Sequence, residues 1–131
     1  MCVGKNAALL ELALNRAYFL EHIAASSLSR QSRDELFMLG LLSFFDTLLG
    51  IPMTAILERM PLPKRMSEAL LTGKGPYGRH LSLAVALHGL DVSLAVALAD
   101  EMRIPYASVN ANSHAALIWA NGVLRESKSV A

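Results

Sequence analysis

Helix-ending signals recur along the whole chain, and they constrain its fold more than any other feature. Glycine or proline follows most of the apolar segments, for example Gly50, Pro61 and Gly73, and both residue types end helices. Alternation of β-branched and polar residues, which would indicate strands, is nearly absent. The sequence therefore predicts an all-α fold, a compact orthogonal bundle of about seven helices. The predicted helices span residues 6–26, 35–49, 52–60, 63–73, 79–90, 92–104 and 108–127.

The most apolar segment lies in the second predicted helix, from Leu36 to Leu49, where Ser43, Asp46 and Thr47 interrupt the apolar side chains. The segment is shorter than the roughly eighteen apolar residues of a membrane-spanning helix, so we expect a helix buried among others and no membrane partner. The mean hydropathy of +0.39 is nevertheless high for a soluble monomer. This surplus indicates an unfilled interface, and we expect a protein partner or self-association.

Charge and cysteine content narrow the function classes. Twelve Lys and Arg against eleven Asp and Glu give a net charge of +1, too small for the basic face of a nucleic-acid-binding protein. A chain of 131 residues forms one domain and needs no disulfide or metal for stability. The single cysteine, Cys2, cannot form an internal bridge, and no secretory signal is visible. We therefore expect a cytoplasmic protein without a nucleic-acid partner.

Histidines and glycine-rich loops do not form a catalytic or metal-binding motif. His80 and His88 lie eight residues apart with no acid between them, unlike the one-turn spacing of helical metal ligands. The loop from Gly73 to Arg79 lacks the spacing of a phosphate-binding loop and reads as a helix end followed by a turn. We therefore predict no catalytic residue, no metal site and no cofactor.

Asp46 is the most unusual acid in the chain, because a carboxylate buried in so apolar a helix requires a partner. Arg16 is an equally isolated charge on the first predicted helix. We predict a structural ion pair between Arg16 and Asp46, whose loss in Arg16→Ala would destabilise the fold by about 3 kcal/mol.

A possible interaction surface comes from the first and last predicted helices. Asn110, His114 and Asn121 share one stripe of the last helix, and Trp119 lies on a different face. This stripe either contacts a ligand or is the solvated side of a terminal helix whose tryptophan anchors the core. The residues predicted for the interaction surface are Tyr18, His22, Asn110 and His114, and which small molecule they would bind is unknown.

The second predicted helix also carries a recognisable motif. Residues 35–53 contain the run Gly-Leu-Leu-Ser-x-x-Asp and end with Leu-Leu-Gly-x-Pro, and further similarity lies in residues 16–21, 60–63, 69–71 and 115–119. These segments resemble the HDOD domain, in particular the version at the C-terminus of bacterial EAL-HDOD signalling proteins. The resemblance covers most of the chain and implies an HD-like helical fold.

HDOD domains are similar to HD and HD-GYP phosphohydrolases, in which a Gly-Leu-Leu-His-Asp run supplies a histidine and an aspartate to the metal. At the matching positions this chain has Ser43 and Phe44, and the first-helix histidine of those enzymes falls at about Arg16. A guanidinium only donates hydrogen bonds and cannot ligate a metal. The resemblance therefore implies a domain that does not hydrolyse its ligand by metal-activated water.

The resemblance implies the second half of an HDOD domain, with the N-terminal half and any EAL domain absent. We expect a non-catalytic signal-transduction module that acts by protein–protein interaction or self-association, as part of a bacterial cyclic-di-GMP-related regulatory protein. The alternative is a degenerate HD-type phosphohydrolase that binds or hydrolyses a nucleotide second messenger through His22, His80 or His114 with Asp46. DNA binding by a helix-turn-helix is a third hypothesis, disfavoured by the charge balance.

Overall fold

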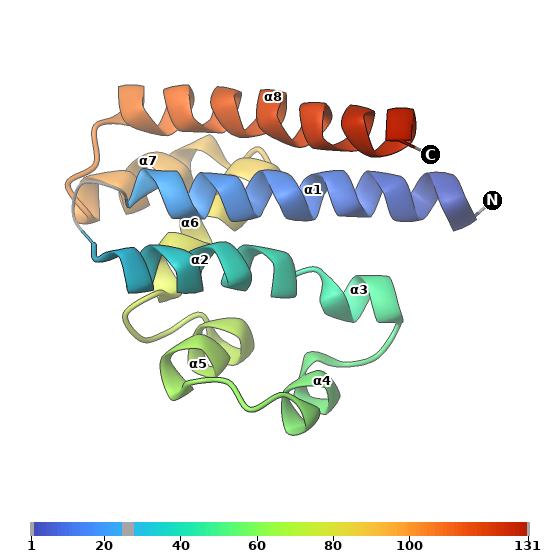
Figure 1. Cartoon of the computed structure of the whole chain (residues 1–131). Coiled ribbons are helices and arrows are strands. Elements are labelled where there is room, and N and C mark those ends of the chain that lie inside the picture. Colours follow the sequence, from blue (N-terminus) through green and yellow to red (C-terminus); the bar gives the residue numbers. More distant parts are fainter. Residues whose placement is uncertain (1, 25–27, 131) are drawn as a thin grey trace.

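The computed structural model describes residues 2–24 and 28–130, with side chains described for 7–24 and 28–126. Its described residues form helices and connecting turns without a strand, which confirms the all-α prediction (Figure 1). They contain eight helices where about seven were expected. The helices are α1 (Cys2–Ile23), α2 (Arg30–Leu42), α3 (Phe45–Leu49), α4 (Met53–Arg59), α5 (Lys64–Thr72), α6 (Gly78–His88), α7 (Val92–Glu101) and α8 (Tyr106–Val130).

Helix α1 is the centre of the arrangement. It packs along its length against α2 on one side and α8 on the other, and it runs antiparallel to both (Figure 1). Helix α6 also contacts α1, and α7 joins α6 to α8. Helices α3, α4 and α5 form a smaller group that continues from the end of α2. Helices α2 and α8 thus flank α1 on two sides, and α6 packs against it as well.

The core lies where α1, α2, α6 and α8 meet. Its largest fully buried side chains come from all four of these helices: Leu20, Leu36, Leu39, Leu42, Leu83 and Val109. Burying each leucine or valine of this kind stabilises a fold by roughly 1.5–3 kcal/mol. Short apolar residues such as Ala17, Ala116 and Ala120 are also fully buried and allow the helices to approach closely.

Several predicted helix ends are confirmed. Asp91 caps α7, with its Oδ1 atom accepting a hydrogen bond from Leu94 N at 3.2 Å. Gly50 and Gly73 end α3 and α5 in the left-handed conformation, with φ of 72° and 71°. The start of the second helix was predicted too late, at residue 35. Helix α2 begins at Arg30, and Ser29 is its N-cap, whose Oγ atom accepts a hydrogen bond from Ser32 N.

The second predicted helix is not continuous. It ends at Leu42, and a separate short helix, α3, begins at Phe45. Ser43 closes α2 and donates a hydrogen bond from its hydroxyl to Gly40 O at 2.8 Å, a local bond that competes with helix continuation. Helix α3 has no fully buried residue, and Leu49 is 56% exposed. The prediction of one buried helix over 35–49 is therefore correct only for its first half.

Gly40 determines how closely α1 and α2 approach. A Cβ atom at this position would lie 2.6 Å from both the Cα and the N atom of Ala17 and 2.9 Å from the carbonyl carbon of Arg16. Because these neighbours are backbone atoms, only glycine permits this separation. The close crossing brings Arg16 on α1 next to the C-terminal end of α2.

None of the helices in the described part of the chain is by itself long and apolar enough to cross a membrane. By length and composition alone, residues 30–49 together with Met53–Arg59 would suffice, but these two parts are bent by 116° relative to each other.

Candidate functional site

Arg16 lies at the contact between α1 and the α2–α3 break. Its Nη1 atom donates a hydrogen bond to Ser43 Oγ at 3.0 Å, and its guanidinium carbon lies 4.2 Å from the centre of the Phe44 ring. The Ser43 hydroxyl in turn donates a hydrogen bond to Gly40 O. The structure therefore brings together the three residues that the sequence resemblance places at the metal-ligand positions of HD hydrolases.

The structure does not form the predicted ion pair between Arg16 and Asp46. Neither residue takes part in the ion pairs found among residues 7–24 and 28–126. The helix break explains the difference, because Asp46 falls in the first turn of α3, where its Oδ1 atom accepts from Thr47 N at 2.8 Å. The carboxylate is half-buried and serves the start of its own helix.

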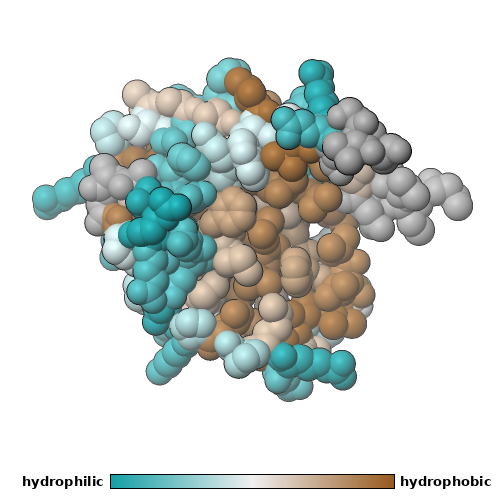
Figure 2. Space-filling model, in the orientation of Figure 1, coloured by the Kyte–Doolittle hydropathy of each residue, from teal (hydrophilic) through white to brown (hydrophobic). Residues whose placement is uncertain are grey.

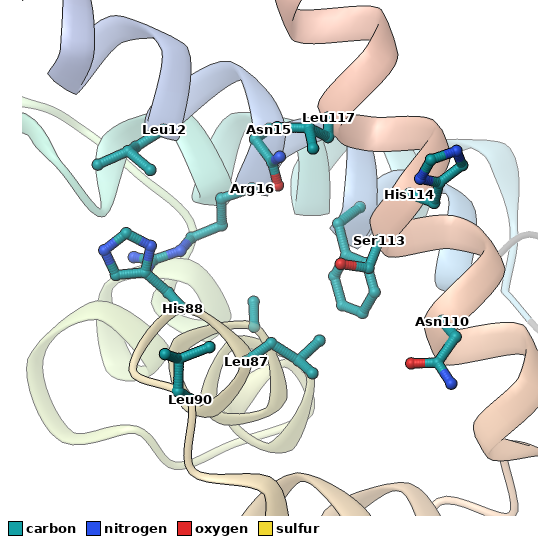
Figure 3. Close-up of a pocket in the computed structure, with 12 residues that line it drawn as sticks. Leu12, Asn15, Arg16, Leu87, His88, Leu90, Asn110, Ser113, His114 and Leu117 are labelled. Carbon is teal, nitrogen blue, oxygen red and sulfur yellow. The ribbon is translucent and has the colours of Figure 1, made fainter.

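Arg16 is also one wall of a pocket of about 510 Å³ between α1, α6 and α8 (Figure 3). Its polar lining residues are Asn15, Arg16, His88, Asn110, Ser113 and His114, and its apolar ones are Leu12, Phe19, Ala84, Leu87, Leu90 and Leu117. Its volume is within the range of small-molecule sites, roughly 300–1,000 Å³. Figure 3 shows Arg16 and His88 on one side of this space, opposite Asn110, Ser113 and His114 of α8.

The Phe44 ring connects Arg16 with His88. The Phe44 and His88 rings meet edge to face with 6.0 Å between their centres, while Arg16 lies against the same Phe44 ring. Burial lowers the pKa of Arg16 to about 10, so the guanidinium is still charged at neutral pH. The corner of the pocket nearest Phe44 therefore holds a fixed positive charge.

The four residues predicted as an interaction surface separate into two places. Asn110 and His114 line the pocket. Tyr18 and His22 instead stack on each other at 3.8 Å, and Tyr18 stacks on Trp119 of α8 at 5.3 Å. The His22 Nδ1 atom is also 2.9 Å from Tyr18 O. Tyr18 and His22 thus belong to an aromatic contact between α1 and α8.

A second polar cluster joins α2, α5 and the start of α6. Glu35 accepts from Arg65 through both carboxylate oxygens, with Nε to Oε1 at 2.7 Å, and also accepts from the Tyr77 hydroxyl at 2.5 Å. The hydrogen bonds from Arg65 lower the pKa of Glu35 to about 2, and the bond from Tyr77 contributes in the same direction. Burial and the bond to Glu35 raise the pKa of Tyr77. This cluster ties α5 and the start of α6 to α2.

The four histidines lie in three places, with His22 in the aromatic contact, His80 on α6, and His88 and His114 at the pocket. Within the described residues, no three His, Cys, Asp or Glu side chains lie close enough together to hold a metal ion. His80 is half-buried on α6, where burial lowers its pKa, while His22 and His114 belong to the two places described above. The alternative site built from His22, His80 or His114 with Asp46 is therefore not assembled as a metal-binding group.

Two functional residues, the pocket residue His88 and the cluster residue Glu35, were not predicted from the sequence. The neighbouring sequence does not indicate either role, since the partners of both residues lie on other helices. For Gly40 the sequence does contain an indication, because a glycine inside an apolar helix often marks a close backbone approach. His88 in particular could be placed only once α6 was seen to pack beside α1.

Comparison with known proteins shows a sequence similarity over part of the chain. The cyclic di-GMP phosphodiesterase CdgJ of Vibrio cholerae serotype O1 (strain ATCC 39315 / El Tor Inaba N16961) is 32% identical over 75 residues. This match spans 57% of the present chain and 17% of CdgJ. No family model matches the chain, and no solved structure matches it significantly. The chain is thus similar to a small part of a protein named for cyclic di-GMP hydrolysis.

Proposed function

We propose that this chain is a non-catalytic, HDOD-like signal-transduction module of a cyclic-di-GMP-related regulatory protein, and that it acts by contacting a partner protein or a second copy of itself. The observation that carries this proposal is the cluster of Arg16, Ser43 and Phe44 at the positions where HD hydrolases hold a metal. A guanidinium and a phenyl ring cannot ligate a metal ion, and a lone hydroxyl is a poor substitute for imidazole and carboxylate. These three residues therefore cannot activate a water molecule in the manner of an HD enzyme.

The similarity to CdgJ supports the signalling context of the proposal. The match covers only 17% of CdgJ. The present chain can therefore belong to the same kind of signalling pathway without catalysing the reaction for which CdgJ is named. In our proposal the matched segment contributes regulation and not phosphodiester cleavage.

Exposed apolar side chains support a docking role. Leu48, Leu49 and Ile51 are large and exposed, and they lie within four residues of one another at and just after the end of α3; we call them the α3 surface. Figure 2 shows a broad apolar area on the side of the molecule where α3 and α4 lie. Exposed apolar patches of this kind are typical of protein contacts.

Light scattering coupled to size exclusion, over a series of protein concentrations, tests the docking role. We expect a mass above the 14.2 kDa of one chain, and Leu49→Glu on the α3 surface should lower the association constant. Leu94→Glu on α7 is the matched control, since Leu94 is another exposed leucine. A strictly monomeric, folded protein that binds no apolar dye would contradict the proposal.

The absence of catalysis needs a separate assay. Purified chain is incubated with cyclic di-GMP and Mg²⁺ or Mn²⁺, and linear and mononucleotide products are quantified. We expect no product above a heat-inactivated control. Turnover that is lost on chelation of the metal would instead favour the degenerate phosphohydrolase.

A further inference from the structure

Arg16 is a buried positive charge for which the described side chains supply no counter-ion. The residue is 9% exposed, and no carboxylate forms an ion pair with it among the residues whose side chains are described. Of the five N–H donors of a guanidinium, one is used in its hydrogen bond to Ser43. A buried charge of this kind reduces stability unless a partner compensates it.

The pocket next to this charge offers hydrogen-bond donors to a negatively charged ligand group. Its lining contains Arg16, two histidines, two asparagines and a serine, and no aspartate or glutamate. His88 is exposed at the pocket and approaches the same Phe44 ring as Arg16. An anion in this corner would meet hydrogen-bond donors without an opposing carboxylate.

The remaining walls of the pocket are suited to an organic ligand. Leu12 and Leu117 lie on α1 and α8, and Leu87 and Leu90 lie before and after His88 at the end of α6 (Figure 3). The volume of about 510 Å³ exceeds what a bare inorganic ion would fill. The polar wall can therefore contact a charged group of such a ligand, and the leucines can contact its apolar part.

We propose that the pocket between α1, α6 and α8 binds a small organic anion, whose carboxylate or phosphate group lies against the Arg16 guanidinium and whose apolar part packs on the surrounding leucines. Ser43 and Phe44 hold the guanidinium in place before the ligand arrives, so little side-chain freedom is lost on binding. The ligand supplies a counter-ion that Arg16 does not find among residues 7–24 and 28–126.

Three probes of equal chain length test this assignment: octanoate, n-octyl phosphate and the neutral analogue octanol. Binding to the full chain is measured by calorimetry and by the shifts of the histidine ring signals in NMR. We expect at least one anion to bind about tenfold or more tightly than octanol. A hydrogen bond between the Arg16 guanidinium and an anionic group is stronger than one between the guanidinium and a neutral hydroxyl group. The ring signals of His88 and His114 should shift, and that of His22, which lies outside the pocket, should not. The tighter anion identifies the carboxylate or the phosphate as the preferred group.

Arg16→Met is the decisive variant, and it should bind the anions no more tightly than octanol. Arg30→Met removes an exposed arginine of α2 that lies outside the pocket, and its anion binding should match that of the unmodified chain. His88→Ala is a second pocket variant, and it should weaken anion binding severalfold. Because His88 is exposed, this variant should fold even if Arg16→Met does not. Saturable anion binding that survives these pocket substitutions, octanol binding as tight as that of both anions, or no saturable binding of either anion would overturn the proposal.

Discussion

The guanidinium of Arg16 lies over the ring of Phe44, with 4.2 Å between its central carbon and the ring centre. Arg16 comes from α1, whereas Phe44 is the residue between α2 and α3. Attraction between a cation and an aromatic face contributes about 2 kcal/mol or more when both are desolvated. The contact joins α1 to the point where α2 ends and α3 begins.

Replacing Arg16 by methionine should leave the free energy of unfolding within about 1 kcal/mol of the unmodified chain, or raise it. The contacts of Arg16 with Ser43 and Phe44 are lost, but so is the cost of burying a charge that has no carboxylate partner among the residues whose side chains are described. Ser43 keeps its bond to Gly40 O in this variant. Chemical denaturation at neutral pH measures the change. A loss of about 3 kcal/mol, the value expected for a broken buried ion pair, would show that Arg16 has an acidic partner after all.

Gly40→Ala should destabilise the fold by about 3 kcal/mol, because the added methyl group meets the backbone of α1 and forces the two helices apart. Gly122→Ala in α8 is the matched control, since a Cβ atom there meets nothing within 4 Å. The control should gain up to about 1 kcal/mol from the higher helix propensity of alanine. Equal effects of the two substitutions in thermal unfolding would contradict the close approach of α1 and α2.

Glu35 should make stability depend on pH in the acidic range. Its pKa is lowered from 4.5 to about 2 in the folded protein, so its contribution is complete above pH 4.5 and is lost as the pH falls toward 2. Glu35→Gln should cost about 2 kcal/mol at neutral pH and approach the unmodified chain at the acidic end. Denaturation at a series of pH values measures this convergence.

Glu58→Gln on α4 is the control for Glu35, because Glu58 is exposed. Its curve should run parallel to that of the unmodified chain over the same pH range. Arg65→Met should reproduce the effect of Glu35→Gln, since it removes the donor that lowers the pKa most. If the Glu35→Gln difference is constant with pH, the hydrogen bonds from Arg65 do not lower this pKa.

Leu90→Gly should stabilise the chain by about 1 kcal/mol. Leu90 has a φ of 60° and is 84% exposed, so its side chain strains the backbone and buries little surface. Leu90→Ala separates the two contributions, because alanine keeps the Cβ atom that causes the strain. Thermal unfolding should rank glycine above leucine, with alanine close to leucine; a less stable glycine variant would show that the Leu90 side chain packs more than its exposure indicates.

Local sequence signals determined most of the helices. Asp91, Gly50 and Gly73 act on neighbouring backbone groups, so their effects as caps can be predicted without knowledge of the fold. The same holds for the all-α class, which depends on the spacing of apolar and helix-ending residues. The resemblance to the HDOD domain also singled out Arg16, Ser43 and Phe44 from sequence alone.

Tertiary structure decided which partner each charged side chain has. Asp46 and Arg16 were predicted to pair because each is an isolated charge in an apolar helix. In the structure Asp46 accepts a hydrogen bond from Thr47 N in the first turn of α3, and Arg16 contacts Ser43 and Phe44. The pocket also depends on helices far apart in sequence, with His88 on α6 and His114 on α8. Helix periodicity reports which side of a helix is apolar, but the identity of its neighbour depends on long-range packing.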